Sequence, residues 1–346
     1  MNEVYFNRYL LILLSILPFS FLIGPSISLT NILVFDISII YFFFIKKEWS
    51  WTNEITIKIF LLLYLYLIFN SLISINPMVG FQRNFGFIRL IVLFIGINYF
   101  FNKYKYSDKI FRFWSLIILL IVMDIFIELI FGSNIFGYGA NEDRVASFFD
   151  DELIVGGFVL SFFFITVGFY LNKLNNFNNL VKIILLIFLI IFFISIIFTG
   201  ERSNSIKAIL GLVILIFSYF KFNLKSLSVL IILFFIIIFT VNKNNYLKNR
   251  FITSIIHSGN TFVSSFQHGT PHDNPSGNLY AKLYRSGYDV FKNYPYFGVG
   301  NKNYRVEACT NKFYHRGIHI TINNYVCMTH PHQIYFELLS EHGILG

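Results

Sequence analysis

Long apolar runs separated by short polar ones dominate the first two-thirds of the chain. Nine runs are long enough, alone or with flanking Tyr and Phe, to form helices that cross a membrane, for which about 20 largely apolar residues are needed. These runs cover about residues 8–24, 28–45, 57–75, 87–101, 112–131, 153–172, 180–199, 206–221 and 226–241. The first run leads through Gly24-Pro25-Ser26 directly into the second. This continuity indicates a helical hairpin rather than a cleavable signal peptide.

A polar segment rich in Asn, Gly, Tyr and His follows the last of these runs. We therefore divide the chain into a transmembrane helical bundle (1–241), a long loop (242–331) and the start of a further transmembrane helix (332–346), which we expect to be truncated at Gly346. All eight histidines lie after residue 256. Long loops of this kind are commonly functional. Residues 286–294 predict an amphipathic helix within the loop, ending before Pro295. The fold class is thus an all-α polytopic membrane protein with about nine or ten transmembrane helices.

Composition supports this assignment. The chain has 346 residues, of which 56% are hydrophobic and only 13% charged, and its mean hydropathy is +0.65. These values exclude a soluble cytoplasmic enzyme, a disordered chain and a small secreted domain held by disulfides. The net charge of +9 does not indicate a nucleic-acid partner, because the basic residues are spread over short loops between apolar runs.

The distribution of these basic residues predicts the orientation. Short cytoplasmic loops carry the excess of Lys and Arg. With the N-terminus in the cytoplasm, the cytoplasmic side has eleven basic residues: Lys46, Lys47, Lys58, Lys103, Lys105, Lys109, Arg112, Lys173, Lys182, Lys221 and Lys225. The other side has five, namely Arg83, Arg144 and Arg202, with Arg89 and Lys207 just inside helices. We therefore expect a cytoplasmic N-terminus and place the loop 242–331 outside the cytoplasm.

Several residues on the outer side are candidates for chemistry. Cys309 and Cys327 share the long loop, and an oxidising compartment would allow a disulfide between them, although two free thiols are the alternative. Arg144 and Arg202 lie in polar turns, and Arg89 lies two residues inside a helix. Each arginine alone can simply extend to the membrane surface. Several together can bind phosphate or pyrophosphate oxygens in two-point contacts.

Three acidic residues lie within predicted spans. Asp124 and Glu128 are four residues apart and share a helix face, and Asp36 lies in the second span. Intramembrane acids are rare and commonly functional. They support a rival hypothesis, a proton-coupled transporter or flippase, and the simpler alternative is a polar contact between helices.

The C-terminal part carries a recognisable set of motifs. Residues 294–300 read Tyr-Pro-Tyr-Phe-Gly-Val-Gly, and His332-Gln333 is followed after nine residues by Gly343-Ile344-Leu345-Gly346. Upstream, Arg202 precedes Ile206 by four positions. These motifs resemble the signature of the O-antigen ligase family of bacterial membrane glycosyltransferases, which also includes O-antigen polymerases. Ile206 replaces the usual Leu, and the family continues for about two more helices.

The resemblance implies inverting, metal-independent glycosyl transfer at the periplasmic face of the bacterial inner membrane. The implied donor is a glycan on undecaprenyl pyrophosphate, and the acceptor is a hydroxyl on lipid A core, on another lipid-linked glycan or on a protein. Within the family we favour the ligase over the polymerase. The alternatives outside glycosyl transfer are a transporter and a non-catalytic assembly partner. The resemblance implies no metal and no nucleotide cofactor, and membrane lipids are the remaining partners.

Roles follow for individual residues. His332 is the candidate general base, since a free imidazole can accept a proton at neutral pH, although it can instead orient the acceptor or bind phosphate. Arg202 is the main candidate for stabilising the leaving pyrophosphate. The other candidate substrate-binding residues are Arg89, Arg144, Arg285, Arg305, Glu201 and His330.

The residues next to Arg202 and His332 allow further interpretations. Glu201 either orients Arg202 by an ion pair or acts as a base. His330 and His332 raise the question of zinc, but no third ligand has a defined spacing. Gln333 can bond near a helix start, and Gly343 and Gly346 predict a close approach of another part of the chain.

Overall fold

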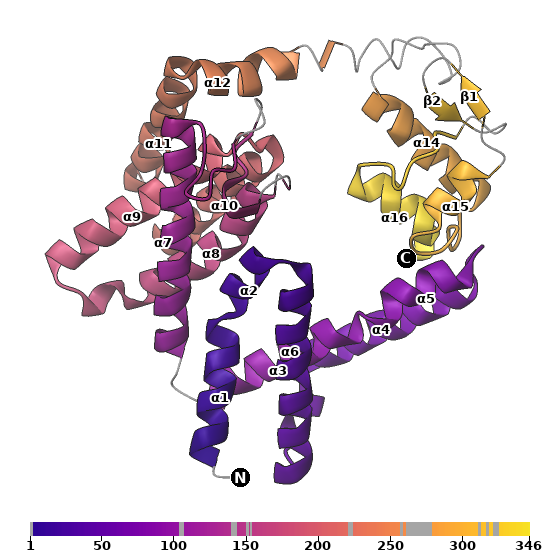
Figure 1. The fold of residues 1–346 in the computed structure, drawn as a ribbon, viewed down its shortest axis with the longest axis horizontal. Coiled ribbons are helices and arrows are strands. Elements are labelled where there is room, and N and C mark those ends of the chain that lie inside the picture. Colours follow the sequence, from indigo (N-terminus) through magenta and orange to yellow (C-terminus); the bar gives the residue numbers. More distant parts are fainter. Residues whose placement is uncertain are drawn as a thin grey trace. The chain divides into compact units, whose positions relative to one another are not determined.

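The computed structural model describes residues 3–103, 107–139, 144–149, 152, 154–220, 224–256, 259–260, 279–310, 313–315, 318–320 and 325–346. Nearly all of the regular structure in these residues is helical, which confirms the all-α polytopic class (Figure 1). By contacts the chain forms two compact units, one of Met1–Asn31 with Tyr104–Ile255 and one of Ile32–Lys103 with Ile256–Gly346. The second unit thus brings the segment after residue 256 together with residues 32–103.

The first unit consists of long apolar helices joined by short turns. Its elements are α1 (Glu3–Ser15), α2 (Leu17–Ile23), the first part of α3 (Pro25–Lys46), α7 (Ser107–Phe131), η2 (Ser147–Phe149), α8 (Val155–Lys173), η3 (Leu174–Asn176), α9 (Asn179–Phe198), α10 (Arg202–Phe220), α11 (Leu224–Lys243), α12 (Asn245–Lys248) and the π-helical turn η4 (Asn249–Thr253). Their interior is mainly apolar, with Ile118, Ile125, Phe163 and Phe192 fully buried.

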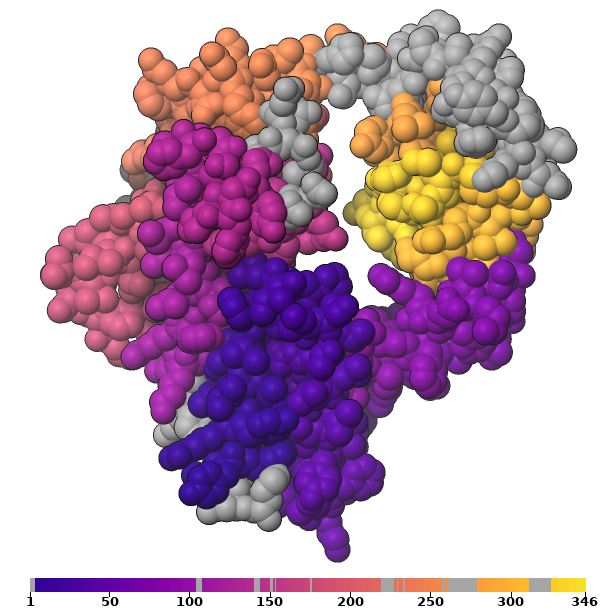
Figure 2. All heavy atoms as spheres, viewed as in Figure 1, coloured from indigo at the N-terminus to yellow at the C-terminus, as the bar shows by residue number. Residues whose placement is uncertain are grey.

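The second unit combines membrane helices with the C-terminal segment. It contains the rest of α3, η1 (Ser50–Asn53), α4 (Ile55–Leu72), α5 (Pro77–Phe85), α6 (Ile88–Lys103), α14 (Leu279–Asn293), α15 (Tyr304–Cys309), β1 (Phe313–His315), β2 (Ile318–Ile320), α16 (Ile334–His342) and the 3-10 turn η5 (Gly343–Leu345). The two short strands form an antiparallel hairpin in which Tyr314 pairs with His319. Figure 2 shows the atoms of α14, α15 and α16 packed into one body. α14 confirms the amphipathic helix expected over 286–294.

The described helices supply six to eight of the nine or ten spans expected. In the described part of the chain, six helices are long and apolar enough to cross a membrane, and two bent pairs raise this to eight. The first predicted span is one of these pairs. It bends by 45° between α1 and α2, because Pro18 in the first turn of α2 supplies no N–H to continue the helix. The second pair bends by 102° where α11 meets α12, and Asn244 caps the new helix by accepting from the Leu247 N–H.

Candidate functional site

The glycine turn of residues 294–300 packs directly on the end of the chain. Four backbone hydrogen bonds join the two segments, from Val299 to Ser340, Gly300 to Glu341, Ile344 to Pro295 and Leu345 to Tyr296. The backbones are so close that a Cβ at Gly298 would lie 2.3 Å from the Glu341 carbonyl carbon, and one at Gly343 would lie 2.3 Å from the Tyr296 oxygen. The two glycine motifs therefore contact each other. The close approach expected at Gly343 is confirmed, and Gly346 meets the Tyr66 hydroxyl in the same way.

A network of buried amides attaches this turn to α4 and α5. Asn70 is fully buried; its amide donates to the Phe297 carbonyl at 3.1 Å, and its oxygen accepts from the Asn301 N–H at 2.8 Å. Asn84 accepts from the Asn301 side chain and donates to Ser71 Oγ at 2.7 Å. Both buried amides of this network thus find partners, as a stable interior requires. These asparagines could have been suspected only from their place at the polar ends of apolar runs.

His330 and His332 lie at the entrance to α16, at the edge of this body. His332 is exposed and has a left-handed backbone with φ of 58°, which is uncommon for a non-glycine residue and costs about 1–3 kcal/mol. The two imidazole centroids are 4.1 Å apart, and the Tyr280 ring meets His332 edge-on at 5.9 Å. Gln333 caps α16 by accepting from the Phe336 N–H, as expected. The His332 side chain is therefore exposed beside the Tyr280 and His330 rings.

The environment of His330 lowers its pKa. Partial burial is the main cause, and the neighbouring imidazole of His332 adds to it. The Thr329 hydroxyl lies 2.9 Å from Nδ1 of His330. In the described part of the chain, no third His, Cys, Asp or Glu joins the two histidines in a group of three. His330 therefore lies beside His332 with a pKa below its usual value.

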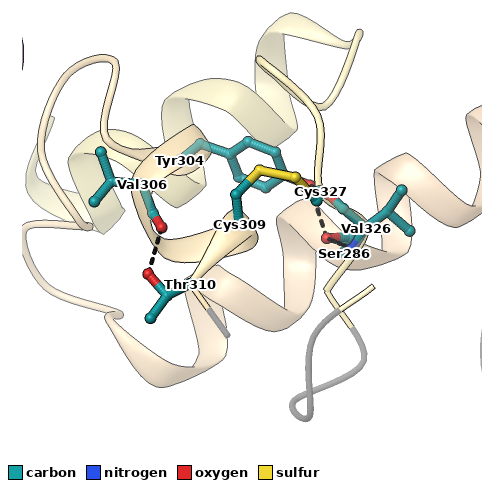
Figure 3. Close-up of a disulfide and its surroundings, with 7 residues drawn as sticks. All are labelled: Ser286, Tyr304, Val306, Cys309, Thr310, Val326 and Cys327. Carbon is teal, nitrogen blue, oxygen red and sulfur yellow. Dashed lines mark hydrogen bonds between the residues drawn. A yellow bond between two sulfur atoms is a disulfide. The ribbon is translucent and has the colours of Figure 1, made fainter. Parts of the chain in front are cut away.

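A disulfide fixes the segment that leads to these histidines. Cys309 at the end of α15 is bonded to Cys327 (Figure 3), which confirms the pairing suggested by their shared loop. Next to it, the buried Ser286 hydroxyl accepts from the Val326 N–H at 2.9 Å and lies 2.7 Å from the Tyr304 hydroxyl. This contact joins α14 to the strand-like segment after the hairpin. The path into 328–332 is thus set by a covalent bond and a buried polar contact.

In the first unit, Arg202 begins α10 directly after a tight turn. Gly200 has φ of 73°, and the next residue, Glu201, is buried. Its carboxylate accepts from the Gly156 N–H at 2.7 Å and from the Asn204 amide. Gly156 lies in the first turn of α8, where a negative charge is favoured by the helix dipole. Glu201 therefore joins α8 to α10, a role that the sequence did not suggest.

Two further residues reach the same turn. Arg250 donates through Nε to the Gly200 carbonyl at 3.0 Å, and the Tyr246 hydroxyl approaches the Thr199 carbonyl at 3.4 Å. The Val145 N–H, next to Arg144, also donates to Thr199, at 3.3 Å. The structure thus brings Arg144, Arg202 and Arg250 to one turn. Sequence reasoning missed Arg250, because nothing in the sequence distinguishes it from the other polar residues of the long loop.

Asp124 and Glu128 hold the segment that carries Arg144. Glu128 accepts from the N–H groups of Ala146 and Ser147, at 3.2 and 2.6 Å. Asp124 accepts from the Ile135 N–H at 3.0 Å and from the Ser147 hydroxyl. Both acids are buried. Their oxygens are occupied by hydrogen bonds that shape the connection between α7 and α8.

The remaining candidate arginines lie in the second unit. Arg89 folds back beside Gly86 and interacts electrostatically with the buried Asp36 of α3. Arg285 is half-buried on α14, and Arg305 is exposed on α15. Arg305 acts electrostatically on His330, as does Lys302, which is paired with Glu337. His332 and its neighbours therefore belong to one unit and Arg202 to the other.

Residues 186–346 match the family model described as O-antigen ligase. This part of the chain, a little under half of its length, is similar to the O-antigen ligase family. The match covers Arg202, the glycine turn and both histidines. No curated protein and no solved structure matches. The family has ligase- and polymerase-type glycosyltransferase activity on lipid-linked glycans, which agrees with the resemblance read from the motifs.

Proposed function

We propose that the protein is an O-antigen ligase-like transferase that moves a glycan from undecaprenyl pyrophosphate onto a hydroxyl of lipid A core at the periplasmic face of the inner membrane. The observation that carries this proposal is His332, an exposed imidazole held in a left-handed conformation within the family's motif. Strained, exposed polar residues of this kind are concentrated at functional sites.

The proposed reaction needs one base and one anion-stabilising group. His332 accepts the proton of the acceptor hydroxyl while the hydroxyl oxygen bonds to the anomeric carbon of the donor sugar. The bond from that carbon to the pyrophosphate oxygen breaks, with inversion, and the electron pair leaves with undecaprenyl pyrophosphate. From the family motif alone we infer that Arg202 stabilises the charge that develops there.

The polymerase remains the second candidate within the family, because it shares these motifs and differs in the acceptor. The transporter hypothesis loses support from Asp124 and Glu128. Both carboxylates are engaged by backbone and hydroxyl donors, and a carboxylate that carries protons through a membrane must exchange its partners. We infer that these acids are structural.

The test gives purified full-length protein the lipid-linked donor with two acceptors, lipid A core and a second lipid-linked glycan, in the presence of EDTA. Glycan on lipid A core supports the ligase, and longer lipid-linked chains support the polymerase. Failure of folded protein to use either acceptor contradicts both and favours a protein acceptor or the transporter.

Two variants assign the roles, His332→Asn and Arg202→Gln. His332→Asn keeps a residue type that tolerates the left-handed conformation, so its loss of activity would identify the imidazole rather than the turn. Arg202→Gln is compared with Lys207→Gln, which removes an exposed charge from the same helix. We expect transfer to be lost in the first member of this pair and kept in the second.

A further inference from the structure

α14 carries a line of tyrosines beside its buried face. Tyr280, Tyr284 and Tyr288 follow at intervals of four residues, so they lie one above another along the helix. Tyr280 is 53% exposed and Tyr288 is 43% exposed. The buried face, with Leu283 and Val290, packs into the core of the second unit. The two ends of the line, Tyr280 and Tyr288, are thus exposed, while Tyr284 between them packs against the cluster of Leu283 and Val326.

This line begins at the candidate catalytic residue. The Tyr280 ring contacts His332, with centroids 5.9 Å apart. The next ring, Tyr284, is 6.4 Å from Tyr280 and stacks on Phe336 of α16 at 5.6 Å. Tyr288 is the far end of the line. A molecule that reaches His332 along α14 therefore passes the three rings in order.

A row of charged side chains runs beside the rings. Arg285 is half-buried on the same helix, and Asp289 and Lys292 form an ion pair at 3.5 Å. The Lys292 ammonium also lies 4.6 Å from the centre of the Tyr288 ring. Rings that can cover the C–H face of a sugar, flanked by groups that bind hydroxyls, are the combination that a carbohydrate requires. A carboxylate in the row makes the surface a poor match for anionic lipid headgroups.

We propose that Tyr280, Tyr284 and Tyr288 form a track that binds the glycan chain of the substrate, with successive sugar rings extending from His332 towards Tyr288. Successive tyrosines, four residues apart, are separated by about 6 Å along the helix axis. This spacing allows each tyrosine ring to contact one sugar or a short group of sugars. This inference rests on the proposed function, since it assigns the glycan to one surface beside the reacting group.

The test measures binding without catalysis. Full-length protein in nanodiscs is titrated with lipid-free O-antigen oligosaccharides, released from bacterial lipid-linked glycan and separated by length. We expect affinity to rise with length, and Tyr288→Ala to weaken binding of the longer oligosaccharides about tenfold, as loss of one stacked ring implies. Tyr288→Phe should bind as the wild type does, because the ring remains. The control Tyr138→Ala removes a tyrosine of equal exposure, 43%, from the other unit.

Two results would overturn the track. One is binding by Tyr288→Ala that equals the wild type at every length. The other is quenching of a Tyr288→Trp variant by brominated phospholipids, which would place the line in the bilayer. The transfer assay on the same preparations separates the two proposals. If transfer requires His332 but Tyr288→Ala binds the oligosaccharides as the wild type does, the track alone is refuted. If Tyr288→Ala weakens binding but no preparation transfers glycan, the transferase alone is refuted.

Discussion

Replacement of Gly300 by alanine should be among the most damaging single-methyl changes in the protein. A Cβ at this position would lie 2.0 Å from Ser74 Cβ, whereas carbon atoms pack at about 3.5–4.0 Å. The backbone also has φ of 97°, and a left-handed conformation costs a residue with a Cβ about 1–2 kcal/mol. Neither cost can be relieved by a side-chain rotation, because both arise at the backbone.

The turn must therefore move, and its movement breaks hydrogen bonds. Gly300 donates to Glu341, and the adjacent Val299 donates to Ser340 and accepts from Ile75. At about 1 kcal/mol for each of these three bonds, with the conformational cost added, Gly300→Ala should destabilise the second unit by about 4 kcal/mol. This corresponds to a fall in melting temperature of about 10 °C.

The assay is heat-induced loss of the monodisperse peak in size-exclusion chromatography of purified protein. Gly168→Ala is the matched control, because a Cβ there meets nothing within 4 Å and alanine favours the helix. Adding Ser74→Gly to Gly300→Ala should recover part of the loss. A melting temperature for Gly300→Ala no lower than that of Gly168→Ala would refute the packing argument.

Four further predictions follow from the contacts described above. Asn70→Leu should lose about 2–4 kcal/mol of stability, measured by the same assay, because several buried polar groups lose their partner; equal stability would show that water replaces the amide. Serine at both Cys309 and Cys327 should cost about 3 kcal/mol from a loop of 18 residues, seen as faster proteolysis between them, and insensitivity of the wild type to reductant would contradict this. Glu128→Leu should lower thermal stability by about 2–4 kcal/mol; unchanged stability with altered substrate export would instead restore the transporter hypothesis. Because the folded state lowers the pKa of His330 from 6.5, the unfolded state binds the proton more tightly, so stability should fall as pH drops below 6.5, and a His330→Asn variant that keeps the same slope would argue against this cause.

The sequence predicted those features that depend on local pattern. Apolar runs located the membrane helices, and the spacing of the motif residues identified His332 and Arg202 as candidates. The disulfide and the cap of Gln333 on α16 also followed from residue type and position. Each of these needs only a few neighbouring residues, or one pair in a shared loop, to be recognised.

Features that depend on distant contacts were not predictable. Asn70 meets Asn301 across 231 positions, and nothing in an apolar run indicates what its single amide contacts. Arg250 reaches the Gly200 carbonyl only because α11 and α12 return the chain to that turn. The role of Glu201 as a cap on α8 likewise depends on the packing of α8 beside Glu201, and the sequence does not reveal which helices pack together. The bend after Ser15, by contrast, could have been inferred from Pro18.

The contact between the two glycine motifs has an evolutionary consequence. Because Gly298 faces the backbone at Glu341 and Gly343 faces the backbone at Tyr296, neither motif can drift while the other stays fixed. The same reasoning extends to residues outside the motifs: relatives that keep Gly300 should keep a small residue where this chain has Ser74, and an amide where it has Asn70. Homologues that have lost one of these features should have lost the others together, which would mark a branch that no longer builds this turn.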